Sequence, residues 1–404
     1  MLKVRWFCHY GALTGYGRAA RDYLAALERV PGIELEIAVL GDGLSSPEPR
    51  YAHLDQYAVP FQQVRGWPDV EIYHAQPRIL AAVDQLAAPD QLAQRRAEGT
   101  GYKRVALTTW ETSPMPPAVS LAMGNFDAVI VPSEFCADLM NDAIYGGSQA
   151  WFPEIVPHCF DEDWWKMPIH TVRSDSSFRF YSIGAWGERK NMIGLLKAYI
   201  HAFTKADPVQ LMLLIEEADF DEIRSTIARS GLQPQALPEL FVPSQILTEE
   251  QLLDLHSSAD CFVTATRGEG WGLGLFEAAI MGRHVIAPLW GGQSDFLDNY
   301  EWTHAVPYQM TPCFGGENRM RVEEHGGQMV QISKVALPPG VDCRQVWADP
   351  DLEALAETMR SVYENREQRS EHDTHEERAS LEAQFGYKTV GPMLANKLRE
   401  IANL

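Results

Sequence analysis

The sequence lacks several features that mark whole classes of protein. None of its six cysteines forms a C-x-x-C pair, and no apolar run reaches the ~18 uncharged residues of a membrane-spanning helix. Lys3 and Arg5 interrupt the short apolar run at the start, which is typical of a first strand and not of a secretion signal. We therefore expect a cytoplasmic protein with buried thiols, no structural zinc site and no membrane span.

Basic residues are also scarce. The chain has 34 Lys and Arg against 55 Asp and Glu, a formal net charge of -21. Such a surface repels phosphate backbones and anionic lipid, which argues against nonspecific binding of nucleic acid or membranes. It still allows a local basic pocket for a small anionic ligand. A length of 404 residues with 46% hydrophobic content is enough for two to three domains and more than one core.

Short apolar runs followed by helical patterns recur along the chain. We expect strands at residues 3–8, 33–40, 69–74, 104–109, 127–132, 178–183, 211–215, 240–242, 260–264 and 284–288. A polar stretch near 160–178 indicates a linker between the first five expected strands and the last five. From about Leu352 the pattern is helical in two pieces, and the charged run at 364–378 is typical of a solvated helix face. Together these patterns predict two doubly wound α/β domains.

Gly15 and Gly17 lie between the first expected strand and a helical pattern that begins near Ala19. A loop at this place can direct backbone N–H groups and a helix N-terminus at a ligand phosphate. The third glycine of the G-x-G-x-x-G dinucleotide fingerprint is missing. A plain tight turn between strand and helix is an equal alternative.

Two adjacent cations, Arg189 and Lys190, follow the strand expected at 178–183. Open α/β sheets bind ligands beyond the carboxyl ends of their strands. A guanidinium can bind a diphosphate through two hydrogen bonds and an ammonium can bind it as a point charge. In so acidic a chain this pair favours an anion site, although two solvated surface cations are the alternative.

Glycine fills every second position from Gly268 to Gly274, and Glu269 and Glu277 flank most of that run. The glycines leave backbone N–H groups free to approach a ligand. We expect Glu277 in about the first turn of a buried helix, where the helix dipole favours a carboxylate. Two carboxylates suit the hydroxyls of a sugar. The alternative is a helix start in which Trp271 and its apolar neighbours only form core.

The segment from Glu269 to Glu277 has the form E-x7-E and resembles the donor-site motif of retaining GT-B glycosyltransferases, particularly family 4. Other segments resemble that family in the same order along the chain, at residues 14–17, 129–133, 155–158, 189–191, 291–297 and 347–350. The resemblance implies a Rossmann-like acceptor-binding domain (1–165) and a Rossmann-like nucleotide-sugar-binding domain (166–380). It also implies a C-terminal helix (381–404) that crosses back to the N-terminal domain.

The resemblance further implies a role for each motif. Glu269 would position the donor sugar, Glu277 would bind the nucleotide ribose, and the two cations would neutralise the diphosphate. The remaining donor-lining positions would be Gly15, Gly17 and the backbone amides of Gly270, Trp271, Gly272 and Leu273. Such enzymes need no metal and no cofactor besides the nucleotide-sugar donor, because cations and helix dipoles offset the leaving-group charge. Retention is thought to follow from front-face attack, with the leaving phosphate helping to remove the acceptor proton.

Two positions depart from the family pattern. Many relatives carry a sugar-contacting histidine after an N-terminal strand, where this sequence has Glu111. A carboxylate there could contact a sugar hydroxyl, take a proton from the acceptor, or cap a helix. Cys159 stands where the family often has glycine, which concerns only a turn near the hinge. His74 also follows a strand, and both a role in the site and a packed role are open.

We therefore expect a glycosyltransferase that moves a sugar from a UDP- or GDP-sugar to an acceptor with retention of configuration. The acceptor and the oligomeric state, including a homodimer, stay open, and the nucleobase pocket is expected around residues 241–245. One alternative is a noncatalytic nucleotide- or sugar-binding protein of this fold. Another is transfer to protein or to a DNA base, although the net charge disfavours duplex DNA. A nicotinamide oxidoreductase would leave Glu269 and Glu277 without a role.

Overall fold

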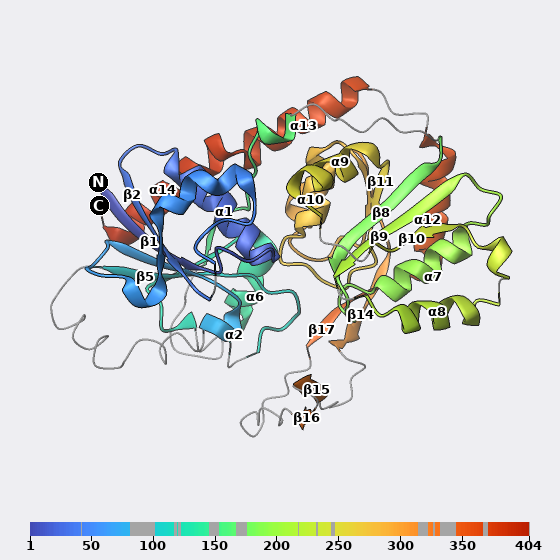
Figure 1. Ribbon diagram of the computed structural model, residues 1–404, viewed down its shortest axis with the longest axis horizontal. Coiled ribbons are helices and arrows are strands. Elements are labelled where there is room, and N and C mark those ends of the chain that lie inside the picture. The colour runs from blue at the N-terminus through green and yellow to red at the C-terminus, as the bar shows by residue number, and fades with distance from the viewer. Residues whose placement is uncertain are drawn as a thin grey trace.

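A computed structural model gives the fold. It describes residues 1–41, 43–80, 102–116, 119, 123–144, 153–166, 176–216, 218–231, 233–243, 247–313, 322–325, 328–331, 345–366 and 371–403. Two parallel sheets with helices packed against them stand side by side (Figure 1). Within the described ranges, every helix is too short or too polar to span a bilayer.

The N-terminal sheet has the strand order β3-β2-β1-β4-β5-β6-β7, and every adjacent pair is parallel. Its strands are β1 (Leu2–Cys8), β2 (Ile33–Val39), β3 (Ala58–Pro60), β4 (Val70–His74), β5 (Lys103–Leu107), β6 (Ala128–Val131) and β7 (Glu154–Ile155). Its helical elements are α1 (Gly15–Glu28), η1 (Pro49–Tyr57), η2 (Phe61–Gln63), α2 (Pro77–Leu80) and α6 (Glu134–Ile144). The central strands are buried on both faces, as parallel strands covered by helices must be.

The C-terminal sheet has the order β10-β9-β8-β11-β12-β13 and is also parallel throughout. Its strands are β8 (Phe178–Ala185), β9 (Val209–Glu216), β10 (Glu239–Phe241), β11 (Cys261–Val263), β12 (His284–Ala287) and β13 (Thr303–Ala305). Its helical elements are η3 (Trp164–Lys166), α7 (Met192–Ala202), α8 (Phe220–Arg229), η4 (Pro234–Ala236), α9 (Glu249–Ser258), α10 (Leu273–Ile280), α11 (Ser294–Leu297) and α12 (Leu352–Glu364). All ten strands expected from the sequence are present, and the two-sheet fold class is confirmed.

Two small antiparallel pairs were not expected from the sequence. Strand β14 (Tyr308–Pro312) pairs with β17 (Val346–Pro350), and β15 (Val322–His325) pairs with β16 (Gln328–Gln331). The β14–β17 pair also reaches the N-terminal half, because the backbones of Ser113 and Val346 exchange hydrogen bonds. The β15–β16 hairpin projects from the rest of the molecule in Figure 1.

The described residues after position 350 form three helices, where the sequence pattern predicted two. After α12, helix α13 (Glu371–Phe385) packs on α10, and α14 (Tyr387–Ala402) packs on α1. Phe385 lies in the same apolar cluster as Trp271 of the C-terminal half, whereas Tyr387 lies in the core of the N-terminal sheet. The chain therefore crosses between the halves at Gly386, and the expected return of the last helix to the N-terminal domain is confirmed (Figure 1).

Candidate functional site

The candidate site lies where the carboxyl ends of strands from the two sheets meet. The loop after β6 contacts the loop after β11, because the Ser133 hydroxyl donates a hydrogen bond of 2.9 Å to the Gly270 carbonyl. The same hydroxyl accepts from the Cys136 N–H and so caps α6. The Glu134 N–H also donates to Asp295 of α11, at 2.8 Å. The backbones that carry the predicted site residues are thus held against one another.

Glu269 is buried and holds both predicted cations. Lys190 Nζ lies 2.7 Å from one carboxylate oxygen and Arg189 Nη1 lies 3.2 Å from the other. The Thr266 hydroxyl donates to the first oxygen at 2.7 Å. Burial by itself would raise the pKa of Glu269, but Lys190, Arg189 and these hydrogen bonds lower it to about 2. Glu269 is therefore ionised at neutral pH, beside two cations.

The position of the two cations follows from local chain chemistry. Asn191 adopts a left-handed conformation (φ 50°), and its side chain accepts from the Gly194 N–H to cap α7. Helix α7 starts at Met192, so Arg189 and Lys190 lie on the turn just before it. Arg189 Nη1 also donates to the Gly268 carbonyl at 2.6 Å. These contacts hold the guanidinium against residues 268–274, which we call the glycine segment.

Two of the alternating glycines are required because the halves approach closely. A Cβ on Gly268 would lie 2.1 Å from the Glu111 carbonyl oxygen. A Cβ on Gly270 would lie 2.6 Å from the Thr109 Cβ. The sequence analysis explained these glycines by the approach of their backbone N–H groups to a ligand. The structure gives them a further reason, which is to let the loop after β5 pack against this segment.

Glu111 reaches the same guanidinium from the N-terminal side. Its Oε1 lies 3.6 Å from Arg189 Nη2, and about a third of its side chain is exposed. Arg189 therefore lies between two carboxylates, Glu111 from one half and Glu269 from the other.

Gly15 and Gly17 belong to α1 and not to a loop before it. The Thr14 side chain accepts from the Gly17 N–H at 3.2 Å, so the helix begins at Gly15, four residues before the expected start near Ala19. A Cβ on Gly15 would lie 3.6 Å from Leu273 Cδ1, which places this helix N-terminus beside the start of α10. Tyr16 donates or accepts a 3.0 Å hydrogen bond with Thr109. The N-terminal N–H groups of α1 thus lie next to the glycine segment.

Glu277 lies just past the first turn of its helix, close to the expected position. Gly272 (φ 93°) is the cap of α10, so Leu273 is the first helical residue and Glu277 is the fifth. Arg18 Nη1 of α1 lies 2.8 Å from one oxygen of Glu277, and His256 Nε2 of α9 lies 3.0 Å from the other. Burial opposes ionisation of Glu277, but Arg18 and His256 outweigh it and lower the pKa.

Trp271 is a core residue, as its side chain was expected to be. It is buried, and its ring packs within 6 Å of the rings of Phe276, Phe296, Phe385 and His158. Only its backbone is available to a ligand. The same backbone run includes Gly270, Gly272 and Leu273.

His74 and Cys159 are both buried. His74 is buried, neither ring nitrogen has a hydrogen-bond partner among the described residues, and burial lowers its pKa well below the usual value. The rings of Trp6, Tyr16 and Tyr23 surround it. Cys159 is a buried free thiol. The nucleobase prediction at 241–245 falls partly outside the described residues, although Phe241 itself is exposed.

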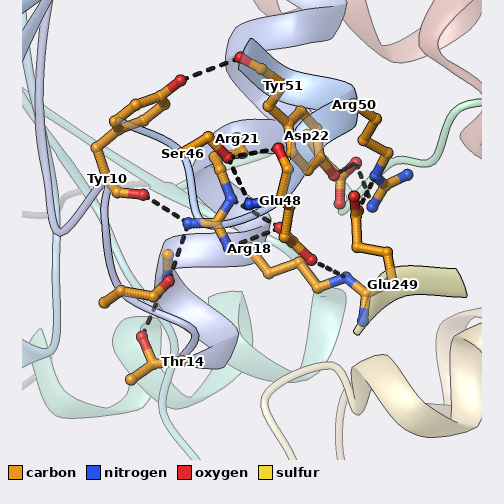
Figure 2. A network of polar contacts seen from close by, with 12 residues as sticks. Tyr10, Thr14, Arg18, Arg21, Asp22, Ser46, Glu48, Arg50, Tyr51 and Glu249 are labelled. Carbon is orange, nitrogen blue, oxygen red and sulfur yellow. Dashed lines mark hydrogen bonds and ion pairs between the residues drawn. The ribbon is translucent and has the colours of Figure 1, made fainter. Parts of the chain in front are cut away.

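Several polar contacts to the site were missed by sequence reasoning. Arg18 follows the glycines by one residue, and this proximity could have suggested it. Thr266 lies three residues before Glu269, so proximity could have suggested it as well. His256 carries no such signal, because only the packing of α9 against α10 brings it to Glu277. Figure 2 shows Arg18 within a larger cluster in which Arg21 and Arg50 meet Asp22, Glu48 and Glu249. In this cluster the Arg50–Glu249 ion pair joins the two halves.

The fold is similar to that of several solved structures. Anabaena HepE, solved with UDP and glucose, matches with a TM-score of 0.63 and 15% identity over 99% of this chain and 100% of that one. Sucrose-phosphate synthase from Thermosynechococcus elongatus matches with a TM-score of 0.64 and 13% identity over 99% of each chain. AviGT4, a glycosyltransferase involved in avilamycin A biosynthesis, matches with a TM-score of 0.52 and 13% identity over 100% and 98%.

These similarities establish the fold, which is the GT-B arrangement of two Rossmann-like units. No protein-family model matches the chain, and no curated protein sequence matches it.

Proposed function

We propose that the chain is a retaining glycosyltransferase that moves a sugar from a nucleoside diphosphate sugar to an acceptor. The observation that carries the proposal is the buried Glu269 carboxylate held by Lys190 and Arg189 beside the glycine segment. A buried carboxylate can accept hydrogen bonds from sugar hydroxyls, and the cations can bind the phosphates next to that sugar. All three groups lie where strands of both sheets end, which is where open α/β sheets bind ligands.

In this proposal the two cations stabilise the leaving group. Departure of a nucleoside diphosphate concentrates negative charge on its β-phosphate, and fixed positive groups in a water-poor site offset that charge. Arg189 and Lys190 supply two such charges, and the N-terminal N–H groups of α1 and α10 add partial charges. The protein's own groups would then fulfil the role that a metal fulfils in other transferases. We accordingly propose transfer without a metal or other cofactor.

Glu269 and Glu111 have different roles in the proposed reaction. Glu269, ionised at neutral pH, orients the donor sugar through its hydroxyls. Glu111 reaches Arg189 from the opposite half and is partly exposed, so it is placed to contact an incoming acceptor. We propose that Glu111 assists removal of the acceptor proton while attack occurs on the face from which the phosphate leaves. That geometry retains the anomeric configuration.

The rest of the donor is assigned to the glycine segment and to α10. The backbone amides from Gly270 to Leu273 line the sugar and phosphates, and Glu277 binds the ribose. The complexes of HepE with UDP and glucose and with UDP-glucose make UDP-glucose the first donor to test. GDP-sugars come second, and the acceptor is left unassigned.

A donor screen followed by one substitution tests the proposal. Thermal shift with UDP, GDP, ADP and TDP identifies the base, since a ligand at 100 times its dissociation constant stabilises a protein by about 2.7 kcal/mol. Turnover of the corresponding sugar donors, as transfer or as slow hydrolysis, is then compared in wild type and Glu269→Ala. We expect Glu269→Ala to lower turnover at least roughly 100-fold.

Glu222→Ala is the matched control, because Glu222 is exposed on α8 and distant in sequence from the site. Activity of Glu269→Ala within a few-fold of wild type contradicts the assignment of Glu269. Nucleotide binding without turnover of any sugar donor supports a noncatalytic binding protein instead.

A further inference from the structure

Glu277 ends a chain of three buried polar groups. Tyr181 of β8 lies with its hydroxyl 2.8 Å from His256 Nδ1, and His256 Nε2 lies 3.0 Å from Glu277 Oε2. Tyr181 and His256 are fully buried, and Glu277 is nearly so. This hydrogen-bonded series runs from β8 of the C-terminal sheet through α9 to α10. Binding of the ribose by Glu277 does not by itself explain the presence of Tyr181 and His256.

The chemistry of the three groups allows one arrangement of protons. A protonated imidazolium is disfavoured, because burial lowers the pKa of His256 even with Glu277 beside it. A neutral ring with hydrogen on Nδ1 would turn its Nε2 lone pair toward an ionised carboxylate, which is repulsive. Only the neutral ring with hydrogen on Nε2 satisfies both contacts. In that tautomer Tyr181 O–H donates to Nδ1 and Nε2–H donates to Glu277.

We infer that His256 is a positioning residue that fixes Glu277 for the ribose of the donor, and that Tyr181, by donating to Nδ1, acts together with Glu277 to hold the required tautomer of His256. The inference rests on the proposed function. His256 occupies Oε2 from the C-terminal side, so the carboxylate cannot rotate freely and its Oε1 faces α1, where Arg18 now contacts it. A fixed carboxylate oxygen can discriminate a ribose from a 2′-deoxyribose, because a buried acceptor is left without its partner when the hydroxyl is missing.

Nucleotide binding gives the first test. Titration calorimetry compares the tightest binder among UDP, GDP and ADP with its 2′-deoxy analogue, in wild type, His256→Gln, His256→Phe and Tyr181→Phe. We expect wild type to prefer the ribonucleotide at least about tenfold. His256→Gln keeps an N–H donor and should keep most of this preference, whereas His256→Phe should reduce it to within about twofold.

Kinetics and a double variant separate positioning from a merely structural effect. With the active donor, His256→Phe should raise KM while kcat stays within about threefold. Tyr181→Phe should reduce the ribose preference in wild type and have little further effect in the His256→Gln background, since the glutamine amide nitrogen is a donor without any tautomer for Tyr181 to hold. His201→Gln, at an exposed position in α7, is the control for a general effect of losing a histidine. An unchanged ribose preference in folded His256→Phe overturns the inference.

A second readout does not depend on nucleotide binding. Long-range ¹⁵N–¹H spectra of histidine-labelled protein at pH 7, assigned with His256→Gln, report the tautomer of His256. We expect hydrogen on Nε2 in wild type and a weaker preference for that tautomer in Tyr181→Phe, because Nδ1 then lacks its donor while Glu277 still accepts from Nε2. Hydrogen on Nδ1 in wild type refutes the inference. If wild type binds no nucleotide, the proposed function fails, while the tautomer still decides how Glu277 is held.

Discussion

At the residue scale, the side chain that distinguishes this site is Arg189, which lies between two carboxylates of different character. Glu269 is buried and its pKa is lowered to about 2, whereas Glu111 is about one-third exposed and contacts Arg189 at 3.6 Å. The buried, ionised Glu269 suits a lasting hydrogen bond to the bound donor. A partly exposed carboxylate near one cation suits transient proton transfer.

Replacing Glu111 by glutamine tests this division. The amide keeps the shape but cannot accept a proton as a base, so we expect kcat for transfer to fall roughly 100-fold. The dissociation constant of the nucleotide should stay within about threefold, because Glu269 and the cations are intact. Steady-state kinetics and calorimetry measure the two quantities. Glu34→Gln, on the exposed part of β2, controls for the loss of one charge, and an unchanged kcat in Glu111→Gln assigns Glu111 a structural role.

The clustering of Glu269 with Arg189 and Lys190 could be predicted, because each lies in the loop after a strand and belongs to a motif with fixed local spacing. The partners of Glu277 could not be predicted in this way. Arg18 and His256 lie 259 and 21 positions before it, and their contacts depend on how α1 and α9 pack against α10. Local patterns carry little information about such packing.

At the scale of elements, the loop after β5 and the glycine segment before α10 behave as one packed unit. Their backbones approach so closely that Gly268 and Gly270 leave no room for a side chain.

The ten expected strands could be predicted because short apolar runs bounded by polar residues are a signal that is local in the sequence. Strands β14 and β17 lacked it, since β14 is mostly exposed and its partner lies more than 30 residues later. The break at Gly386 was missed because helical patterns continue on both sides.

Gly270→Ala tests the close approach of the two elements. The added Cβ would lie 2.6 Å from the Thr109 Cβ, and overpacking of this kind typically costs about 1–3 kcal/mol. We expect a loss of that order in the free energy of unfolding, measured with urea. Adding Thr109→Gly removes the clashing atom, so the double variant should recover part of the loss beyond additivity. If the stability losses of the two single variants simply add in the double variant, the two positions are not in contact.

At the scale of the whole molecule, ion pairs join the two halves beside the site. Arg18 contacts Glu277 and Arg50 contacts Glu249, each linking the N-terminal sheet's elements to a helix of the C-terminal half. Glu249 is buried, and burial raises its pKa from 4.5 to about 7; Arg50 opposes this effect and Glu48 adds to it. The junction therefore contains a carboxyl group that changes charge near neutral pH.

The sign of the resulting pH dependence follows from proton linkage. Between about pH 4.5 and 7 the folded protein binds the Glu249 proton more tightly than the unfolded chain, so this group's contribution to stability falls as pH rises. We expect the stability of wild type relative to Glu249→Gln to be greater at pH 5 than at pH 8. Urea denaturation of both proteins at the two pH values measures the difference. Glu250→Gln, at the exposed neighbouring position, should show no such change, and a difference of opposite sign contradicts the assignment.

The return of α14 to α1 has a consequence for how the protein is made. Residues Val390, Leu394 and Leu398 belong to the same core as Trp6 and Leu24, yet the ribosome adds them after the whole C-terminal sheet. At typical synthesis rates the first sheet waits on the order of tens of seconds for the helix that covers part of α1. During that interval an apolar face of the nascent chain is open to solvent and to chaperones. The N-terminal half can therefore complete its fold only after α14 (Tyr387–Ala402) has been translated.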